Sequence, residues 1–377
     1  MRFVHVKSGL SRHVVRFVES GEDRFAVKET TVEIGRREFL NYSEVARRGI
    51  PTLTPVGVVV RDEGARTVRT NIGMQRQEVQ TAYLVTRLME KVIPDSFLFK
   101  RAFSRDNRRR IWNAVIDLFV QLHANGIYWG DASLANMLIH FSTEHVPEVG
   151  RRTRLQAILA DAETVEIRSS LSERLRLADV ELFLESMLWT EADVVASGVV
   201  RDPMLTQADQ EYIIRHYRER YALDEEMRSF ELLTHIDVDR VLGTFEFEGT
   251  GKLLLQHIQE HKWYLSERGG REVPLTTAAE DWYSRVFRPV CGVFHEHGLM
   301  DLFPERTAAT LYVAIMEHKY FMSEREHRDV GLVPALEDYA TRFSTHRKAP
   351  SVVGAIVGAL TSLFRGDPWA HQDSWAR

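Results

Sequence analysis

The chain has 377 residues and a mass of 43.5 kDa, a length typical of two or three domains. Hydrophobic residues make up 44% and charged residues 27%, an ordinary balance for a globular protein with a sizeable core. The net charge of −5 gives no electrostatic reason to expect a nucleic-acid partner. The single cysteine, Cys291, excludes an internal disulfide framework and favours a reducing compartment, so we expect a cytoplasmic protein.

Two apolar patterns bear on membrane association. The N-terminal residues 1–6 alternate in the manner of a strand, so we expect no signal peptide there. The longest apolar run, Val352–Phe364, is too short to span a bilayer, and we expect a C-terminal core helix rather than a surface anchor or dimer contact. The sequence therefore predicts no transmembrane segment.

The first 90 residues have the pattern of β-strands around one helix. A helix over Arg36–Arg48 is predicted to end at Gly49-Ile50-Pro51, because glycine followed by proline stops a helix. We expect a mainly antiparallel sheet with this helix inserted after its third strand. Segments rich in β-branched or aromatic residues predict strands at Phe3–Lys7, Val14–Glu19, Arg24–Glu29, Val56–Arg61, Thr67–Asn71 and Thr81–Leu88.

After Pro94 the pattern becomes mainly helical. Apolar residues at helical spacing predict a helix over Arg108–Ala124. Two short apolar segments follow, Met137–Ile139 and Leu155–Ala160, and each adjoins a polar cluster. From about Ser170 onward the periodicity is almost wholly that of helices.

The C-terminal part contains an internal repeat. Residues 254–286 align without gaps on residues 311–343, and the shared positions include Glu-His-Lys and Ser-Glu-Arg triplets. A repeat of this length predicts a duplicated helical hairpin. For its conserved charges we expect caps and interhelical ion pairs, with binding of an anionic group through Arg268, Arg271, Arg325 and Arg328 as the alternative.

The segment from Tyr128 to Ile139 has the layout of a phosphotransferase catalytic loop. Asp131 is followed five residues later by Asn136 and then by an apolar strand. An aspartate in this position accepts or orients the proton of an acceptor hydroxyl, and the asparagine oxygen binds magnesium. A second aspartate, Asp161, ends the apolar run 25 residues after Asn136 and is suited to hold magnesium against phosphates.

A lysine and a carboxylate lie upstream with matching spacing. Phe25-Ala26-Val27-Lys28 is a strand that ends in lysine. The next helix offers Glu38 as a carboxylate to hold that lysine, with Glu44 as the other choice. Any one of these residues has an ordinary structural explanation, such as an edge-strand lysine or a turn aspartate. Their joint order and spacing carry the functional interpretation.

These motifs resemble the protein-kinase-like superfamily. The likeness is closer to lipopolysaccharide kinases of the Kdo/WaaP type and to aminoglycoside-phosphotransferase-like kinases, and it covers about residues 1–200. It rests on residues 37–52, on the strand at residues 82–88, on Trp129-Gly130-Asp131, and on the lysine strand. The helical remainder resembles an uncharacterised domain that follows such kinase-like domains in bacterial proteins.

The resemblance implies a role for each matching residue. Lys28 would bind phosphates and Glu38 would position it, while Asp131 would be the catalytic base. Asn136 and Asp161 would be metal ligands, with Glu163 as a further candidate. Backbone groups around Arg87, Leu88 and Met89 would meet the adenine, and the loop Lys7–Arg12, with its single glycine Gly9, would cover the phosphates. ATP and Mg²⁺ are the implied cofactors.

The implied fold class is α+β. We expect a two-lobed kinase-like domain, with an antiparallel-sheet N-lobe at 1–90 and a mainly helical C-lobe at 91–200. An all-α extension with the duplicated unit would occupy 201–377. The implied activity is ATP- and Mg²⁺-dependent phosphoryl transfer to a hydroxyl of a small-molecule, glycan or protein acceptor.

Two alternatives to this activity remain open at the level of sequence. Asp161-Ala162-Glu163 replaces the Asp-Phe-Gly of kinases, and the phosphate loop is poor in glycine. Both departures fit a nucleotide-binding pseudokinase or regulatory module whose helical domain recruits a protein partner or forms an oligomer. In the second alternative the kinase fold is a scaffold, and the repeated helices hold the functional site.

Overall fold

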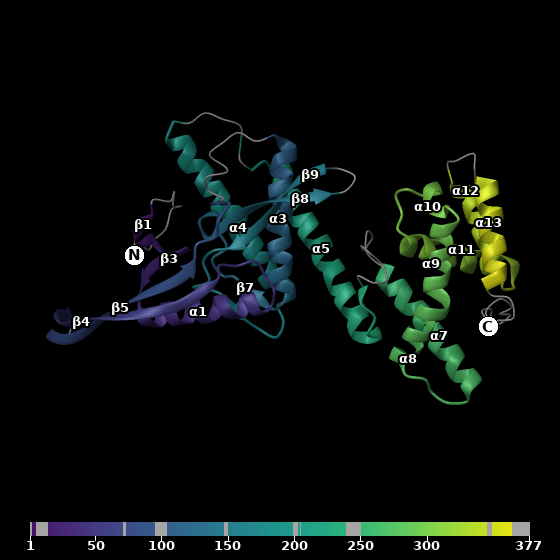
Figure 1. The fold of residues 1–377 in the computed structure, drawn as a ribbon, viewed down its shortest axis with the longest axis horizontal. Helices are drawn as coiled ribbons and strands as arrows, with labels where there is room; N and C mark the ends of the chain where they lie inside the picture. Colours follow the sequence, from purple (N-terminus) through teal and green to yellow (C-terminus); the bar gives the residue numbers. More distant parts are fainter. Residues whose placement is uncertain are drawn as a thin grey trace. The chain divides into compact units, whose positions relative to one another are not determined.

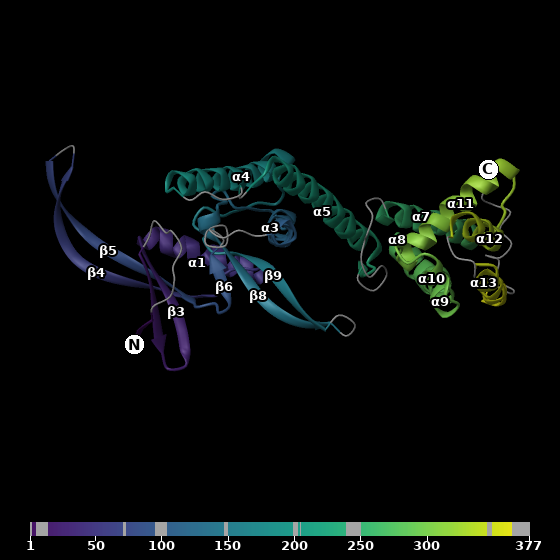
Figure 2. The ribbon, with the colours of Figure 1, turned by 90° about the horizontal axis from the view of Figure 1, so that it is seen from above.

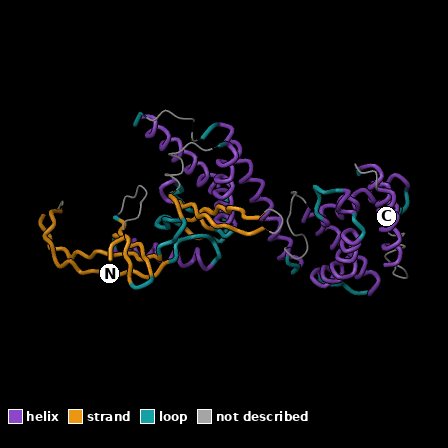
Figure 3. The backbone as a smooth tube through the Cα atoms, turned by 45° about the horizontal axis from the view of Figure 1, so that its top comes forward, coloured by secondary structure: helices purple, strands orange, loops and turns teal. Residues whose placement is uncertain are grey.

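The structure is a computed structural model that describes residues 2–4, 14–70, 73–94, 104–146, 150–198, 203, 205–238, 250–344 and 349–363. The chain divides into two compact units, Met1–Tyr221 and Ala222–Arg377. The described strands all belong to the first unit, and the described part of the second unit is helical (Figure 3). No helix among the described residues has the length and apolar character needed to cross a membrane.

A five-stranded antiparallel sheet forms the N-terminal part of the first unit. Its strand order is β1-β2-β3-β5-β4, and the paired ends of β4 and β5 extend beyond the other strands (Figures 1 and 2). The central position of β3 places Lys28 opposite Leu84 of β5 on one side and Val15 of β2 on the other. The strands are β1 (Arg2–Val4), β2 (Val15–Ser20), β3 (Asp23–Thr30), β4 (Pro55–Thr70) and β5 (Gly73–Arg87).

The prediction of three strands after the first helix was wrong in number, because the structure has two strands in this region, β4 and β5. The segments expected at Val56–Arg61 and Thr67–Asn71 belong to one strand, β4, as far as Thr70, while Asn71 lies outside the described residues. The polar residues between them form a register shift against β5 between Asp62 and Ala65. Gly64 adopts φ +76° there, and its N–H donates to Asp62 Oδ1 at 2.9 Å. A β-bulge and a turn share this composition, so the pattern alone did not separate them.

Helix α1 (Val32–Arg47) lies between β3 and β4 and begins earlier than the expected Arg36. Thr31 is its N-cap, with a side-chain oxygen that accepts from Ile34 N at 3.3 Å. The helix ends where glycine and proline predicted it. Gly49 adopts φ +74°, and the N–H of Ile50 donates to the carbonyl of Val45 at 3.2 Å.

The rest of the first unit is organised around helix α3 (Arg105–Ala124). Its residues Trp112, Val115 and Phe119 are fully buried and lie at the centre of the unit's apolar core. Strands β6 (Val92–Pro94), β8 (Met137–Val146) and β9 (Gly150–Leu159) form a small sheet, and β7 (Ile127–Tyr128) pairs with β10 (Glu166–Ile167). A short 3₁₀ turn (Leu134–Asn136) precedes β8, and helices α4 (Glu173–Ala196) and α5 (Gln207–Thr234) follow.

The second unit has its own apolar core, built around Trp282, Phe287 and Tyr312. The expected α+β class with an all-helical extension is therefore confirmed. The helices are α7 (Thr250–Gly269), α8 (Leu275–Trp282), α9 (Arg288–Glu296), α10 (Leu299–Leu302), α11 (Ala308–Glu326), α12 (Leu332–Phe343) and α13 (Ala349–Leu363), with a π-helical turn at Tyr283–Phe287.

The sequence repeat corresponds to two helical hairpins, α7–α8 and α11–α12, held by the same contacts. In the first copy His261 Nε2 pairs with Asp281 Oδ2 at 2.9 Å, and in the second His318 Nε2 pairs with Asp338 Oδ2 at 2.7 Å. The conserved charges of the repeat thus join the two helices of each hairpin.

The turns of the two hairpins are also equivalent. Lys262 pairs with Glu272 at 2.8 Å, and its counterpart Lys319 pairs with Asp329 at 3.0 Å. A serine hydroxyl oxygen accepts the backbone N–H of a valine in each copy, Ser266 from Val273 at 3.0 Å and Ser323 from Val330 at 3.2 Å. The triplets in the sequence repeat therefore specify the geometry of a helix–turn–helix.

Gly126 provides a test of the connection that leads into the predicted catalytic loop. It adopts φ +70°, and a Cβ placed on it would collide with the carbonyl oxygen of Arg168. Gly49 has a similar φ of +74°, but a Cβ there would meet nothing within 4 Å. We expect Gly49→Ala to lower the free energy of unfolding by about 1–2 kcal/mol from backbone strain alone. Gly126→Ala should cost about 3 kcal/mol or more, because β7 and β10 must also separate.

Urea unfolding of both variants measures the two costs. Equal losses of stability would show that the packing of Gly126 against Arg168 does not restrict this connection.

Candidate functional site

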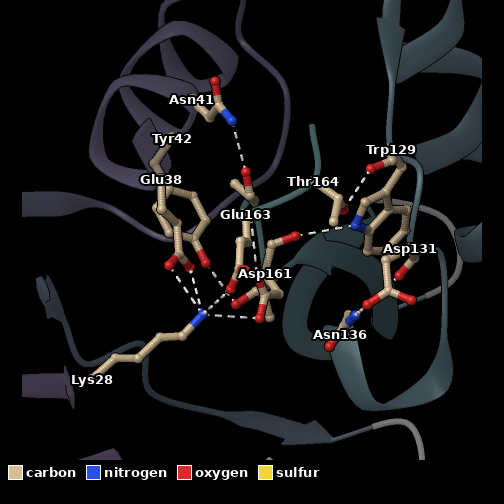
Figure 4. A network of polar contacts seen from close by, with 12 residues as sticks. Lys28, Glu38, Asn41, Tyr42, Trp129, Asp131, Asn136, Asp161, Glu163 and Thr164 are labelled. Atoms are coloured by element: carbon tan, nitrogen blue, oxygen red, sulfur yellow. Dashed lines mark hydrogen bonds and ion pairs between the residues drawn. The ribbon is translucent and has the colours of Figure 1, made fainter. Parts of the chain in front are cut away.

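Lys28 lies at the centre of a cluster of three carboxylates (Figure 4). Its ammonium contacts Glu38 Oε2 at 3.0 Å, Asp161 Oδ2 at 3.0 Å and Glu163 Oε2 at 3.8 Å. Glu38 is 1% exposed, while the Lys28 side chain is 12% exposed. Strand β3, helix α1 and the loop after β9 each contribute to this cluster, although these segments lie far apart in the sequence.

The electrostatics of the cluster favour positive charge. Burial disfavours the charged form of Lys28, but the attraction of Asp161 and Glu38 outweighs it and raises the pKa of the lysine. Burial, followed by repulsion from Asp161, raises the pKa of Glu38 to about 7, against the opposing effect of Lys28. Three carboxylates around one ammonium leave an excess of negative charge for a cation to neutralise.

The loop after β9 is fastened to α1 by side chains next to Glu38. Tyr42 donates its hydroxyl to the carbonyl of Ala160 at 2.6 Å. Asn41 Nδ2 donates to the carbonyls of Ala162 at 2.8 Å and Val165 at 3.1 Å. These bonds satisfy loop carbonyls on both sides of Asp161, so the position of the aspartate depends on the position of α1.

Asp131 and Asn136 form the second polar group of the site. Asn136 Nδ2 donates to the carbonyl of Asp131 at 2.9 Å and to its Oδ2 at 3.0 Å. The amide nitrogen is thus committed to Asp131, and the amide oxygen points away from this pair (Figure 4). A 3₁₀ turn at Leu134–Asn136 brings the side chain of Asn136 back to Asp131.

Trp129 connects the catalytic loop to the loop that carries Asp161. The indole is fully buried, and its Nε1–H donates to the carbonyl of Asp161 at 3.1 Å. Thr164 Oγ1 donates in return to the carbonyl of Trp129 at 2.8 Å. Trp129 therefore has a positional role that the sequence did not reveal.

A buried aspartate that the sequence motifs did not indicate binds the backbone of the predicted catalytic loop. Asp179 of α4 is completely buried and accepts the N–H groups of Trp129 at 2.6 Å and Gly130 at 2.8 Å. Its Oδ2 also lies 3.2 Å from His123 Nε2, and His123 Nδ1 lies 2.7 Å from the hydroxyl of Tyr217. Burial lowers the pKa of His123, against the effect of Asp179. A polar residue inside an apolar helix face was the available signal for Asp179.

The segment expected to meet adenine lies on the wall of the same cavity, but two of its backbone groups are already used. Arg87 N donates to the carbonyl of Thr54 at 2.9 Å, and Leu88 N to the carbonyl of Arg24 at 2.8 Å. The N–H of Met89 has no hydrogen-bond partner among the described residues. Met89 is therefore the better placed of the three for contact with a base. Gly9 and the loop Lys7–Arg12 lie outside the described residues.

A cavity of about 1050 Å³ contains the groups described above. Lys28, Asp131, Asn136, Asp161 and Met89 all line it. One face of α4 forms a further part of the wall, through residues spaced by three and four positions. This face consists of Leu182, Glu185, Ser186, Trp189 and Thr190.

Trp189 on this face was not indicated by the sequence motifs. Its side chain is 73% exposed, which is unusual for tryptophan and typical of a contact surface. The α4 face is attached to the catalytic loop, because Leu134 N donates to Ser186 Oγ at 3.3 Å. Trp189 therefore lies on the wall of the cavity at a position fixed relative to Asp131.

The chemistry of the donor set fits a hard divalent cation. Asp161 and Glu163 supply carboxylate oxygens, and Asn136 supplies an amide oxygen whose nitrogen is already bonded. Magnesium binds oxygen ligands and needs only one or two carboxylates beside phosphate oxygens. Glu44, the alternative partner considered for Lys28, instead pairs with Arg47 at 2.6 Å and Arg48 at 2.7 Å.

Several solved structures align with more than half of this chain. Among solved structures, WaaP in complex with acyl carrier protein aligns with a TM-score of 0.38 and 19% identity, over 61% of this chain and 83% of that chain. Aminoglycoside-3'-phosphotransferase of type VIII aligns with a TM-score of 0.37 and 17% identity, over 58% and 86%. The Rio2 kinase–ADP/Mg²⁺–phosphoaspartate complex from Chaetomium thermophilum aligns with a TM-score of 0.28 and 15% identity, over 57% and 72%.

A family model matches part of the second unit. A model described as a domain of unknown function, DUF4032, matches residues 276–343, which run from α8 to the end of α12. No curated protein matches the chain.

Substitution of Asp179 tests whether the buried carboxylate supports the catalytic loop. In Asp179→Asn an amide NH₂ group must face the N–H groups of Trp129 or Gly130, so at least one bond to the loop is lost. We expect the free energy of unfolding to fall by about 3 kcal/mol, because hydrogen bonds to a buried charge are strong. Glu181→Gln is the matched control, since Glu181 is an exposed carboxylate on the same helix. Similar stability of the two variants in urea unfolding would contradict this role.

Proposed function

We propose that the first unit is a phosphotransferase that uses ATP and magnesium to phosphorylate a hydroxyl group. The observation that carries this proposal is the bridge of Lys28 to Glu38 and Asp161 on the wall of a cavity that also contains Asp131 and Asn136. A lysine held between two carboxylates is fixed in position to meet phosphate oxygens. The nearby carboxylate–amide pair is suited to an acceptor hydroxyl.

Each residue has a role in the proposed reaction. Lys28 binds phosphate oxygens, and Glu38 keeps its ammonium in place. Asp131 orients the acceptor hydroxyl and accepts its proton as the new O–P bond forms, while the bond from the γ-phosphorus to the β–γ bridging oxygen breaks and ADP leaves. Asn136, Asp161 and Glu163 would hold magnesium, which supplies positive charge beside the phosphates.

The α4 face of the cavity is the proposed acceptor side. Trp189 offers a flat apolar surface, and Glu185, four residues earlier on the helix, has no ion-pair partner among the described residues. No lysine or arginine lines this face, so the local charge favours a neutral or cationic acceptor over an anionic one. A small molecule, a glycan or a protein side chain remains compatible with this surface.

A second candidate function is nucleotide binding without transfer. The contact of Lys28 with Glu163 as a third carboxylate favours it, because glutamate occupies a position where kinases have glycine. In this case the cavity would act as a nucleotide sensor, and the helical unit would contact a partner. Activity measurements separate the two functions.

Thermal unfolding with ATP, with and without magnesium, tests the nucleotide site. A ligand at a hundredfold its dissociation constant stabilises a protein by about 2.7 kcal/mol, which gives a measurable shift in Tm. We expect a shift that requires magnesium in the wild type and disappears in Asp161→Asn. A shift that is independent of magnesium would favour the sensor, and no shift at millimolar ATP would contradict both functions.

Phosphate transfer tests the role of Asp131. We expect Asp131→Asn to retain the magnesium-dependent shift in Tm but to lose at least a hundredfold in transfer rate, because general-base catalysis contributes about 10²–10⁴-fold. The readout is release of ADP across a panel of hydroxylated acceptors. Equal rates for the wild type and the variant would remove Asp131 from the mechanism.

Truncation of Trp189 tests the acceptor side. In Trp189→Ala we expect KM for the acceptor to rise about tenfold, as for loss of one aromatic contact, with KM for ATP unchanged. Leu188→Ala is the matched control, because Leu188 is a neighbouring exposed residue that does not line the cavity. A change in KM for ATP, or the same effect in both variants, would place the acceptor elsewhere.

A further inference from the structure

The second unit contains a cavity of its own, apart from the proposed active site. It has a volume of about 710 Å³, within the range of small-molecule sites. Its wall comes from the first helix of each repeat, α7 and α11, and from the end of α11. The residues are Leu253, Gln256, His257 and Glu260 of α7, and Met316, Glu317, Lys319, Tyr320, Phe321, Ser323, Glu324 and His327 at α11.

The wall carries carboxylates without a protein partner among the described residues, beside the Tyr320 hydroxyl and the His327 ring. The Glu317 and Glu324 carboxylates have no hydrogen bond or ion pair among the described residues, and both side chains are exposed. The strong donors are already engaged. Lys319 pairs with the buried carboxylate of Asp329 at 3.0 Å, and Gln256 Nε2 donates to Glu260 Oε1 at 3.1 Å.

His257 is a further residue of this wall with an unpartnered polar atom. Its Nδ1 is buried and has no hydrogen-bond partner among the described residues. Burial, and to a smaller extent the charge of Lys319, lowers the pKa of His257 to about 4, so the ring is neutral at pH 7. In the Nε2–H tautomer Nδ1 is an acceptor. A donor that entered the cavity could satisfy this nitrogen after a rotation of the ring, and buried polar atoms rarely stay unpaired.

The apolar part of the wall limits the kind of donor. Leu253 and Met316 present aliphatic surface, and Tyr320 and Phe321 are 61% and 63% exposed. Aromatic rings attract cations, and aliphatic side chains pack against methylene groups. Glu260 and Glu317 are equivalent residues of the two repeats, so the duplication brings two carboxylates to one cavity.

We propose that this cavity binds an aliphatic polyamine, with its ammonium groups at Glu317, Glu324 and Glu260 and its methylene groups along Leu253 and Met316. Because Lys319 is paired with Asp329, the carboxylates of the wall are the groups that select a cationic ligand. The site is independent of the proposed phosphotransferase activity, and it gives the helical unit a binding function of its own.

Isothermal titration calorimetry of the full chain with spermidine tests this proposal, with 1,4-butanediol as an uncharged comparison. We expect spermidine to bind and the diol not to bind. Glu317→Gln and Glu324→Gln should each weaken spermidine binding about tenfold, by removal of one charge partner. Glu267→Gln is the matched control, because Glu267 is the counterpart of Glu324 in the first repeat, is equally exposed and does not line the cavity.

The comparison of equivalent glutamates in the two repeats therefore distinguishes binding at a specific site from nonspecific attraction of spermidine to acidic side chains. Equal losses of affinity in Glu324→Gln and Glu267→Gln would overturn the proposal, and so would equal binding of the diol. No detectable binding of spermidine by a chain whose circular dichroism shows folded helices would also overturn it. All these substitutions are at exposed positions, so loss of folding does not obscure the result.

Discussion

The arrangement of the first unit depends on where the charge of Lys28 is neutralised. A half-buried ammonium in a sheet requires carboxylates, and the chain supplies them from a helix and from a distant loop. Glu38 can reach Lys28 only if α1 packs on the sheet, and Asp161 can reach it only if the loop after β9 folds against α1. The charge cluster therefore links three segments whose other contacts would allow several relative positions. A cation or phosphate that enters this cluster would redistribute the same charges.

Two buried groups transmit that order to the catalytic loop. The indole N–H of Trp129 joins Asp161 to the segment before Asp131, and Asp179 binds the N–H groups at the start of the same loop. The loop is held from both sides, by the segment that carries Asp161 and by α4. Because the bonds end on backbone groups, they constrain the path of the chain and leave the side chains of Asp131 and Asn136 directed to the cavity.

The sequence was sufficient to predict the elements that depend on local rules, such as helix stops, strand composition and repeats. Glycine and proline after α1, the β-branched and aromatic residues of β2 and β3, and the gapless repeat predicted elements that the structure contains. The strand count failed at Asp62–Gly64, because a bulge and a turn use the same residues. Asp179, His123 and Trp189 were missed because their roles depend on contacts across more than forty residues of sequence or on exposure, neither of which has a local pattern. The roles of Lys28, Glu38, Asp131, Asn136, Asp161 and Glu163 stay predictions, although the structure brings them to one cavity.

The paired contacts of the C-terminal repeat have a consequence for how such a chain can change in length. Each histidine–aspartate, lysine–carboxylate and serine–backbone contact lies within one hairpin, and none of these pairs joins one copy to the other. The polar contacts that fix the geometry of each hairpin therefore lie within that hairpin. Units of this kind can be gained, lost or exchanged by recombination without redesign of their neighbours, provided that the apolar faces between them still match. The C-terminal unit is in this sense modular, while the first unit, whose contacts connect distant segments, is not.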